Sequence, residues 1–266
     1  MKINIPDSID LKNSKPYVFA LCIHPSEFSI FLFHPAFPEI NFHHLIPNAD
    51  NRDVFANFKE VFFENDFFTF PYQKIWIVNK NRFFTFVPSA VFDEKDSPRY
   101  FHFQVVENRD KILSDALLTP DITLLHTLSE TVYEFIVRSL PTARFISYLS
   151  PIVRTHYKEA LLDSEQRMVV VLDRLGFDIV CFSRGSFLFA NHFDTLDVGN
   201  IMYYLLFSWK QWKFDQNRDT MYIQSFREML PLVEVLEEAL KNYILNIIVH
   251  AESHIPVDLK TLQLCE

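Results

Sequence analysis

Hydrophobic residues along this chain gather in short runs that polar turns separate. The clearest succession has apolar runs at 168–172, 177–182 and 187–193, with Asp173 directly after the first. Short apolar runs bounded by turn residues are typical of buried strands. The pattern predicts a three-stranded antiparallel meander whose first turn carries the carboxylate of Asp173.

The same succession occurs about 149 residues earlier, with apolar runs at 17–23, 28–33 and 40–44. His24 stands six residues before Ile30, just as Asp173 stands six residues before Ile179. Each meander is followed by a predicted helix (52–64 and 197–213) and by a further apolar strand (74–78 and 220–224). A repeated order of four elements predicts a duplicated fold.

The remaining segments alternate between strand and helix patterns. Strands are predicted at 82–88, 122–126, 144–149 and 246–250, and a last helix at 231–244. The pattern over 100–118 is ambiguous and leaves open one more strand, at 101–106. Thr127 and Glu130 have the spacing of a helix capping box, and Ser150 with Pro151 is typical of a helix start. Alternating strands and helices indicate an α/β fold. We expect two lobes, 1–165 and 166–266, separated by the polar connector 163–167.

Composition narrows the functional classes. The chain has 266 residues, 49% of them hydrophobic, which suffices for a large core, and a net charge of −9 argues against a nucleic-acid partner. No apolar run approaches the ~20 residues of a membrane helix, and the first residues lack a secretory apolar segment. The three cysteines, Cys22, Cys181 and Cys265, lack paired spacing. We therefore expect a cytoplasmic protein that does not insert into a membrane.

The order of elements resembles a known fold. A meander followed by helix, strand, helix and strand, present twice, is similar to the duplicated RNase-H-like fold of actin-like ATPases, which include actin, sugar kinases and pilus-assembly ATPase-like proteins. More narrowly, FTFVP at 84–88 and FISYLSP at 145–151 resemble an uncharacterised Bacteroidetes family with that fold. The resemblance covers about residues 15–251.

The resemblance also implies where a nucleotide would bind. In actin-like ATPases, the turn after the first strand of each lobe carries an Asp and, two residues later, a Gly. His24 and Ser26 occupy these positions in the first turn. In the second turn Asp173 is retained, but Leu175 replaces the glycine and Gly176 comes one residue late. Glycine lets backbone N–H groups approach a phosphate, so both turns are degenerate as phosphate sites.

A third motif, the adenosine turn, is a glycine pair in actin-like ATPases. Here the strand at 220–224 continues into Ser225 and Phe226, whose side chains fill the place of that pair. The cleft candidates are thus His24, Ser26, Asp173, Gly176 and Ser225. We predict that His24 and Asp173 face a shared cleft too crowded for adenine nucleotide.

Other chemistries receive less support from the sequence. His43 and His44 are adjacent on a predicted strand, so they point to opposite faces and cannot hold one metal ion together. Asp173 with Asp178 suggests a carboxylate nuclease, but Asp178 reads as a turn residue at a strand start. Trp209 and Trp212 are expected in the core, between the lobes, or in a docking patch. We predict no metal site and no catalytic residue.

Two functional hypotheses follow. The first is a non-catalytic, actin-like pseudo-ATPase without a cofactor, acting through protein–protein interaction with an unidentified protein or with a second copy of itself. The alternative is a divergent nucleotide-binding ATPase or switch that binds ATP with Mg²⁺ and uses Asp173 as its remaining metal-side carboxylate.

Overall fold

The computed structural model describes residues 2–24, 26–47, 53–104, 110–117, 121–162 and 165–265. The chain forms two compact units, the first ending at Ser150 and the second covering Pro151–Cys265. Most of helix α4 (Leu149–Ala160) is therefore part of the second unit. The predicted lobe boundary at 165–166 would place that helix in the first.

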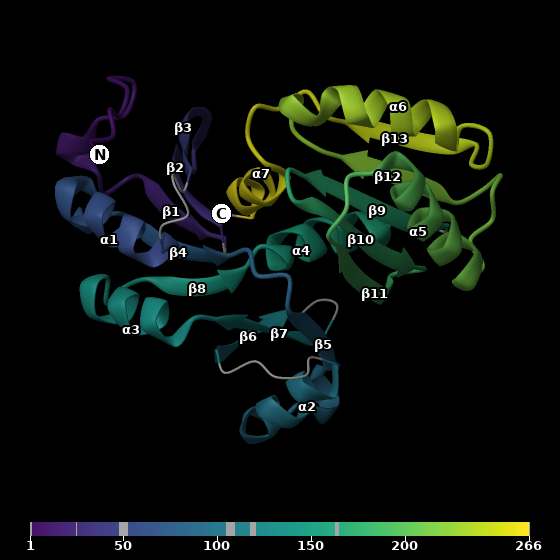
Figure 1. Ribbon diagram of the computed structural model, residues 1–266, viewed down its shortest axis with the longest axis horizontal. Coiled ribbons are helices and arrows are strands. Elements are labelled where there is room, and N and C mark those ends of the chain that lie inside the picture. Colours follow the sequence, from purple (N-terminus) through teal and green to yellow (C-terminus); the bar gives the residue numbers. More distant parts are fainter. Residues whose placement is uncertain are drawn as a thin grey trace. The chain divides into compact units, whose positions relative to one another are not determined.

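The first unit is built on a five-stranded mixed sheet (Figure 1). Its strands are β1 (Val18–Ile23), β2 (Glu27–His34), β3 (Phe37–Pro47), β4 (Lys74–Asn79) and β8 (Arg144–Ser147), in the order β3-β2-β1-β4-β8. The first three strands form the predicted antiparallel meander, while β1, β4 and β8 run parallel. The apolar runs therefore mark the sheet correctly.

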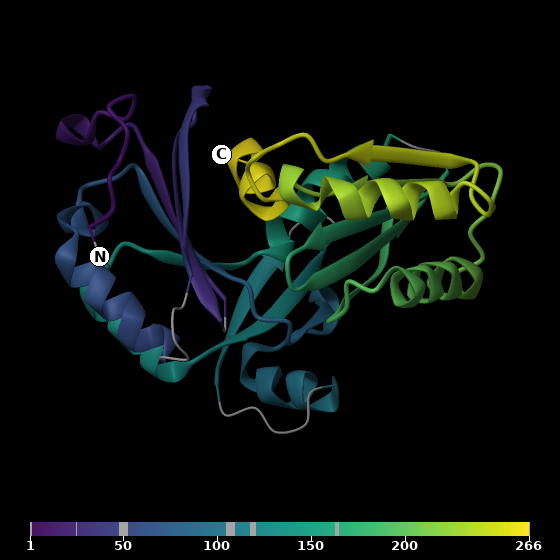
Figure 2. The ribbon, with the colours of Figure 1, turned by 45° about the horizontal axis from the view of Figure 1, so that its top comes forward.

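Helices α1 (Val54–Glu64) and α3 (Glu130–Ser139) pack against one face of this sheet (Figure 2). Phenylalanine dominates their contact: Phe58 meets Phe28, Phe68 and Phe135 in edge-to-face geometry, with ring centroids 5.3–6.2 Å apart. Edge-to-face pairs add to the free energy gained by burial. The abundance of phenylalanine thus has a structural use in this core.

A small antiparallel sheet is inserted between β4 and α3. It contains β5 (Phe84–Pro88), β6 (Lys111–Leu117) and β7 (Ile122–Leu128) in the order β5-β7-β6. Helix α2 (Ser97–Gln104) covers it, and Phe101 is fully buried against Val87 and Leu125. The additional strand left open at 101–106 is therefore wrong over 101–104, and 105–106 lie outside the described residues. Pro98 in the first turn favours a helix there.

The second unit repeats the strand order of the first. Its strands are β9 (Gln166–Asp173), β10 (Gly176–Ser183), β11 (Ser186–Phe193), β12 (Thr220–Gln224) and β13 (Asn246–His250), in the order β11-β10-β9-β12-β13. Helices α5 (Val198–Gln211) and α6 (Leu230–Leu240) pack on one face and share a core with it. The predicted duplication of the fold is confirmed, with the β5–β7 segment as an insertion in the first copy.

Several local predictions need correction. Thr127 is buried inside β7, and the residue that precedes α3 as its N-cap is Ser129, so the predicted capping box is wrong. Ser150 lies within the first turn of α4, which begins one residue earlier. A final helix, α7 (Val257–Leu264), was not predicted. Trp209 is buried in the second core, and Trp212 stacks on Phe189.

None of the helices in the described ranges combines the length and the apolar character that crossing a membrane requires.

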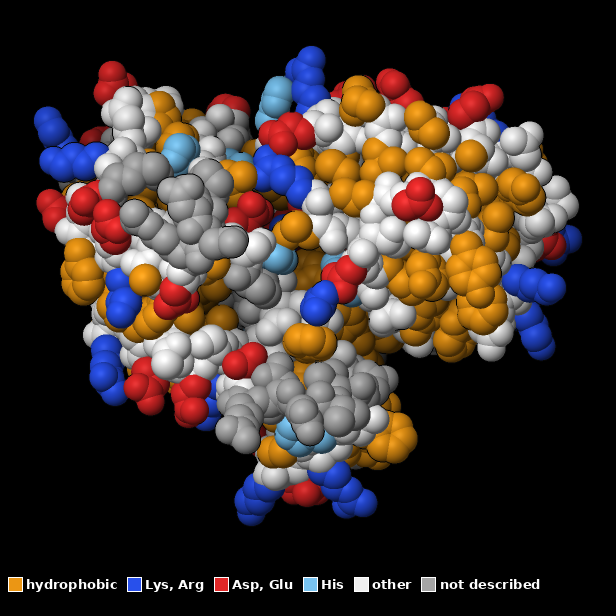
Figure 3. All heavy atoms as spheres, in the orientation of Figure 1, with side chains coloured by type: hydrophobic (Ala, Val, Ile, Leu, Met, Phe, Trp, Pro, Cys, Tyr) orange, Lys and Arg blue, Asp and Glu red, His pale blue; other side chains and the backbone are white. Residues whose placement is uncertain are grey.

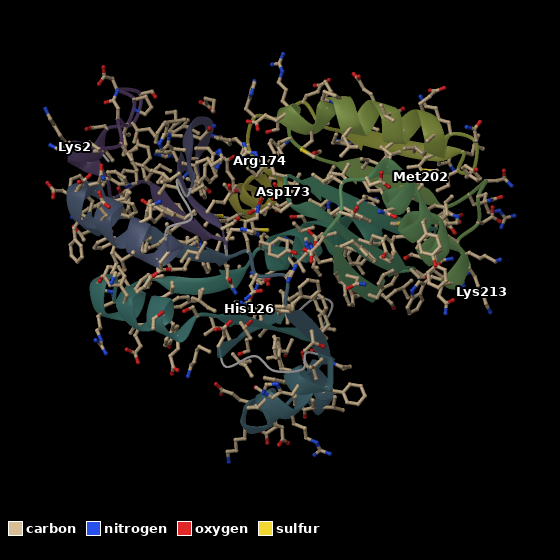
Figure 4. All side chains as sticks on the ribbon, in the orientation of Figure 1. Lys2, His126, Asp173, Arg174, Met202 and Lys213 are labelled. Atoms are coloured by element: carbon tan, nitrogen blue, oxygen red, sulfur yellow. The ribbon has the colours of Figure 1, made fainter. Side chains whose placement is uncertain are left out.

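A buried carboxylate ties the inserted sheet to the main sheet. Asp115 of β6 accepts hydrogen bonds at Oδ2 from the backbone N–H of Ser147 (2.7 Å) and from the hydroxyl of Ser150. Its Oδ1 lies 3.4 Å from Nε2 of His126, a residue labelled in Figure 4. The Asn79 amide donates to the other ring nitrogen of His126 at 2.7 Å, so the ring proton lies on Nε2 and faces Asp115. Five elements, β4, β6, β7, β8 and the start of α4, therefore converge on this cluster.

We expect Asp115→Ala to lower the free energy of unfolding by about 3–5 kcal/mol, because it leaves buried donors without an acceptor. Urea unfolding followed by circular dichroism measures the change. Asp7→Ala, at an exposed position of the same unit, is the matched control and should stay within about 0.5 kcal/mol of the wild type. Equal stability of the two variants would contradict the role given to Asp115.

Candidate functional site

The first phosphate-type turn joins β1 to β2 and is closed on itself. The backbone N–H of His24 donates to the carbonyl of Glu27 (3.0 Å). The imidazole Nδ1 of His24 accepts from the backbone N–H of Ser26 (3.1 Å) and lies 2.9 Å from its hydroxyl. The N–H at the degenerate glycine position is thus used within the turn. Pro25 lies outside the described residues.

The second turn is a tight hairpin between β9 and β10, in which Asp173 pairs with Gly176 across the ladder. Oδ1 of Asp173 accepts from the backbone N–H of Arg174 at 2.7 Å. Asp173 and Arg174 both lie at the end of β9 (Figure 4). His24 and Asp173 therefore hold equivalent places, each pairing with the residue three positions later, and each accepts a hydrogen bond from its own turn.

The side chain of Arg174 turns toward the third predicted motif. Its Nε and one terminal nitrogen donate to Oε2 of Glu228, at 3.1 and 2.6 Å, and its guanidinium lies 5.2 Å from the ring centroid of Phe226. Glu228 belongs to the short helix η5 (Arg227–Met229). One arginine therefore connects the second phosphate-type turn to the adenosine-type turn.

Ser225 and Phe226 are both 3% exposed. The hydroxyl of Ser225 donates to the carbonyl of Leu172 (2.9 Å), and its backbone N–H donates to the carbonyl of His250 (2.9 Å). These bonds fasten the segment after β12 to the ends of β9 and β13. At the position of the expected adenosine turn, the chain presents a packed aromatic ring and a hydroxyl that already donates a hydrogen bond.

The backbone conformation and the packing at position 176 require a glycine. Its φ is +152°, and an added Cβ would lie 2.2 Å from the carbonyl oxygen of Phe193 at the end of β11. No side chain fits in that space. The one glycine near the degenerate second turn is therefore required by the packing of β10 against β11.

Two of the candidate residues line cavities. His24 lines a mostly apolar cavity of about 250 Å³ in the first unit, at the ends of β1 and β4. Ser225 lines a more polar cavity of about 380 Å³ in the second unit, between the ends of β12 and β13 and helices α4 and α7. Asp173 and Gly176 line neither cavity.

A buried histidine, His156, lies beside the second cavity, and no sequence pattern identified it as a site residue. His156 is 1% exposed; Nδ1 lies 3.1 Å from Oε2 of Glu159, and Nε2 lies 3.0 Å from Oε1 of Gln224. Arg167 also pairs with Glu159 and lies over the ring of Tyr222. The hydrogen bond to His156 lowers the pKa of Glu159 despite the opposing effect of burial, and the charge of Arg167 adds to it. The cluster holds α4 against β9 and β12.

The prediction that Asp178 is a turn residue at the start of its strand is wrong. Asp178 is the third residue of β10, is 3% exposed, and lies 2.9 Å from Nδ1 of His192 on β11. Nε2 of the same histidine lies 3.1 Å from Asp194. Burial works to lower the pKa of His192, but the two carboxylates outweigh it, so the pKa is raised.

Within the described ranges, no group of three or more His, Cys, Asp or Glu residues is placed to hold a metal ion. His126 and His156 each contact a carboxylate and an amide, and His192 contacts two carboxylates.

Two units with one strand order, each carrying its turn at the end of the first strand, define an actin-like ATPase fold. The chain belongs to the family described as "Protein of unknown function (DUF3822)", whose model matches residues 6–247. The family resemblance seen in the sequence is thereby confirmed. No curated protein sequence matches the chain.

Solved structures give the same result for the fold. The chain is similar to a Bacteroides thetaiotaomicron protein with an actin-like ATPase fold and unknown function, at 26% identity and a TM-score of 0.83, over 97% of this chain and 99% of that one. It is also similar to a chain of the PilM–PilN type IV pilus biogenesis complex, at 10% identity and a TM-score of 0.51, over 88% of each chain. The second similarity concerns the fold alone.

We expect Gly176→Ala to lower the free energy of unfolding by about 2–4 kcal/mol, through backbone strain and overlap with the Phe193 carbonyl. Gly199→Ala, in the first turn of α5, is the matched control: its added Cβ meets only the Asp197 carboxylate, at 3.2 Å. That variant should be neutral or more stable by up to about 1 kcal/mol. Denaturant unfolding compares the two, and a neutral Gly176→Ala would show that the β10–β11 packing is not as tight as described.

His192 should make stability depend on pH. Because its folded-state pKa is raised, its contribution is fully present below the unfolded-state pKa and is lost as pH rises through the folded-state pKa. Wild-type stability, measured by urea unfolding from acidic to alkaline pH, should therefore fall across that window relative to His192→Gln. Asp194→Asn, which removes the more exposed carboxylate, should reduce the effect. Parallel pH profiles for the wild type and His192→Gln would show that His192 does not contribute to the pH dependence of stability.

Proposed function

We propose that this protein is a non-catalytic member of the actin-like fold that acts by binding another protein chain. The observation that carries the proposal is the packing of the adenosine-type turn: Phe226 is buried, and Arg174 spans from the second phosphate-type turn to its ring and to Glu228. The groups that would face a nucleotide are used in contacts within the second unit.

Magnitudes identify which contact matters most. The ion pair of Arg174 with Glu228 is partly exposed, and such pairs contribute about 0–1 kcal/mol, so it could open readily. Expelling a buried phenylalanine costs about 1.5–3 kcal/mol, and the Ser225 hydrogen bond to Leu172 would be lost as well. Phe226 and Ser225 are therefore the larger obstacle to a nucleotide. The residues present do not fit the ATP and Mg²⁺ of the fold family.

Surface chemistry supports a protein partner. Tyr203, Phe207 and Val235 are 62%, 56% and 55% exposed on the outer faces of α5 and α6, where apolar side chains gather (Figure 3). Exposed apolar patches of this kind mark interaction surfaces. A protein of similar fold, PilM, is found in a complex with PilN, which provides a precedent for the fold in a protein assembly.

We expect calorimetric titration of ATP or ADP with Mg²⁺ into the purified chain to give no binding in the micromolar range, about −8 kcal/mol. The reason is that buried Ser225 and Phe226 stand where the resemblance implies an adenosine turn, and the turn N–H of Ser26 is already bonded. A Leu175→Gly, Ser225→Gly, Phe226→Gly variant tests whether space alone is limiting. It should also fail to bind, because the defects of the first turn remain.

The alternative nucleotide switch predicts the opposite result. A ligand at a hundred times its Kd adds about 2.7 kcal/mol of stability, so Mg-ATP would raise the melting temperature clearly. A rise that is lost in Asp173→Ala would refute the pseudo-ATPase proposal in favour of the switch. The proposal that the protein binds another chain needs a separate test. Sedimentation of the pure protein at high concentration detects self-association, and reconstitution with a protein captured from the native cell detects a partner. A chain that forms neither complex would contradict it.

A further inference from the structure

Helix α5 of the second unit is apolar on all sides over most of its length. Residues 201–207 read IMYYLLF, and a helix that is hydrophobic all round is normally buried on every side. Here one side is buried, with Ile201 and Leu205 in the core of the unit. The opposite side presents Tyr203 and Phe207, which are 62% and 56% exposed. The outer side of α5 therefore carries aromatic rings where a surface helix normally carries polar residues.

The exposed residues of α5 form a single stripe along the helix. Asn200, Tyr203, Phe207 and Lys210 are all exposed, and their spacing of three and four residues places them on one face. The rings of Tyr203 and Phe207 stack on each other, with centroids 6.0 Å apart and planes 20° apart. The middle of the stripe is therefore a preformed aromatic surface, and its two ends are polar.

The charges of α5 stand at its two ends and have opposite signs. Asp197 precedes the helix as its N-cap, Lys210 lies in its last turn, and Lys213 is exposed just after its end. The residues between Asp197 and Lys210 include no charged side chain. None of the three charged residues forms an ion pair with any residue that the structure describes. One end of the stripe is therefore acidic, the other is basic, and both charges are available to a partner.

The stripe is symmetrical about its middle. Three pairs of residues are centred on the level of Leu205 along the helix: Tyr203 with Phe207, Asn200 with Lys210, and Asp197 with Lys213. If two copies of the helix pack antiparallel around a two-fold axis at this level, each residue lies opposite its pair-mate in the other copy. The aromatic rings then meet in the middle, each basic end faces an acidic end, and the helix dipoles are antiparallel. The surface is therefore complementary to itself in apolar character and in charge.

We propose that the protein forms a homodimer in which α5 of one copy packs antiparallel against α5 of a second copy. The Tyr203 and Phe207 rings of the two copies pack together, and the basic end of each helix faces the acidic end of the other. A different partner would not require opposite charges at matching distances from the centre of the stripe. This inference rests on the proposed function, because it names the chain that the protein binds as a second copy of itself.

The first test is analytical ultracentrifugation of the full-length protein over a range of concentrations. We expect the wild type to associate reversibly into dimers. Phe207→Glu places a charge in the middle of the stripe and should raise the dimer dissociation constant roughly tenfold or more, as for a central interface residue. Phe103→Glu is the matched control, because Phe103 is a 91% exposed phenylalanine on a different helix, α2, and this variant should dimerise like the wild type. Circular dichroism checks that each variant is folded.

A charge exchange then tests the antiparallel pairing itself. Asn200→Lys places a second base opposite Lys210, and Lys210→Glu places a second acid near Asp197, so each variant should weaken the dimer several-fold. The variant with both substitutions should recover affinity, because the new lysine of one copy faces the new glutamate of the other. The two positions lie about 15 Å apart along one helix, so the recovery cannot arise within a single chain. Lys158→Glu, in the last turn of α4, is the matched control and should have no effect.

Each outcome decides the α5 dimer separately from the proposed function. A wild type that is monomeric at every concentration, equal self-association of Phe207→Glu and the wild type, or no recovery in the double variant would overturn the dimer. A monomeric protein that binds a protein captured from the native cell would overturn the dimer and keep the proposed function. Micromolar ATP binding by a protein that dimerises through α5 would instead refute the pseudo-ATPase and keep the dimer.

Discussion

The buried carboxylate of Asp115 is the interaction on which the first unit depends. The inserted β5–β7 sheet makes few contacts with the main sheet, so its attachment relies on a small number of strong ones. Asp115 supplies them by accepting from Ser147 at the end of β8 and from Ser150 at the start of α4. His126 completes the link to Asn79 at the end of β4. A charged group in this position is stable only because donors surround it.

The same cluster fixes one wall of the cavity in the first unit. Asn79 is held by its hydrogen bonds to His126 and Thr127, and it lines the cavity at the edge where α1 and α3 begin. The inserted sheet therefore does more than extend the unit: through β7 it provides Leu128 and the approach to α3. The second unit has the same strand order without the insertion, and its buried polar cluster at the end of β12 is a different one, in which His156 of α4 contacts Gln224 and Glu159.

Most strands could be predicted from local apolar runs in the sequence. The buried polar residues could not, because their contacts are formed between distant parts of the chain. Apolar runs located both meanders, because a strand buried on both faces is recognisable from a few residues. The segment at 101–104 was misread, since Phe101 and Phe103 alternate like a strand, while Pro98 and a single buried ring favour the helix. Asp178 could not be recognised as buried, because its partner His192 lies on the neighbouring strand. Asp115 and His156 were missed for the same reason: Asp115 contacts Ser147, 32 residues away, and His156 contacts Gln224, 68 residues away, and a single polar residue has no periodicity.

The turns after β1 and β9 have the same geometry although their residues differ from those that the resemblance implies. His24 and Asp173 still sit at equivalent places, and each still accepts a hydrogen bond within its turn, which is the local role a short polar side chain has in many turns. The residues around the second turn are fixed by packing within the second unit. Gly176 cannot accept a side chain because of Phe193, Ser225 bonds Leu172, and Phe226 is in the core. Once these residues stabilise the second unit, restoring a backbone-lined nucleotide turn would cost stability at every one of them.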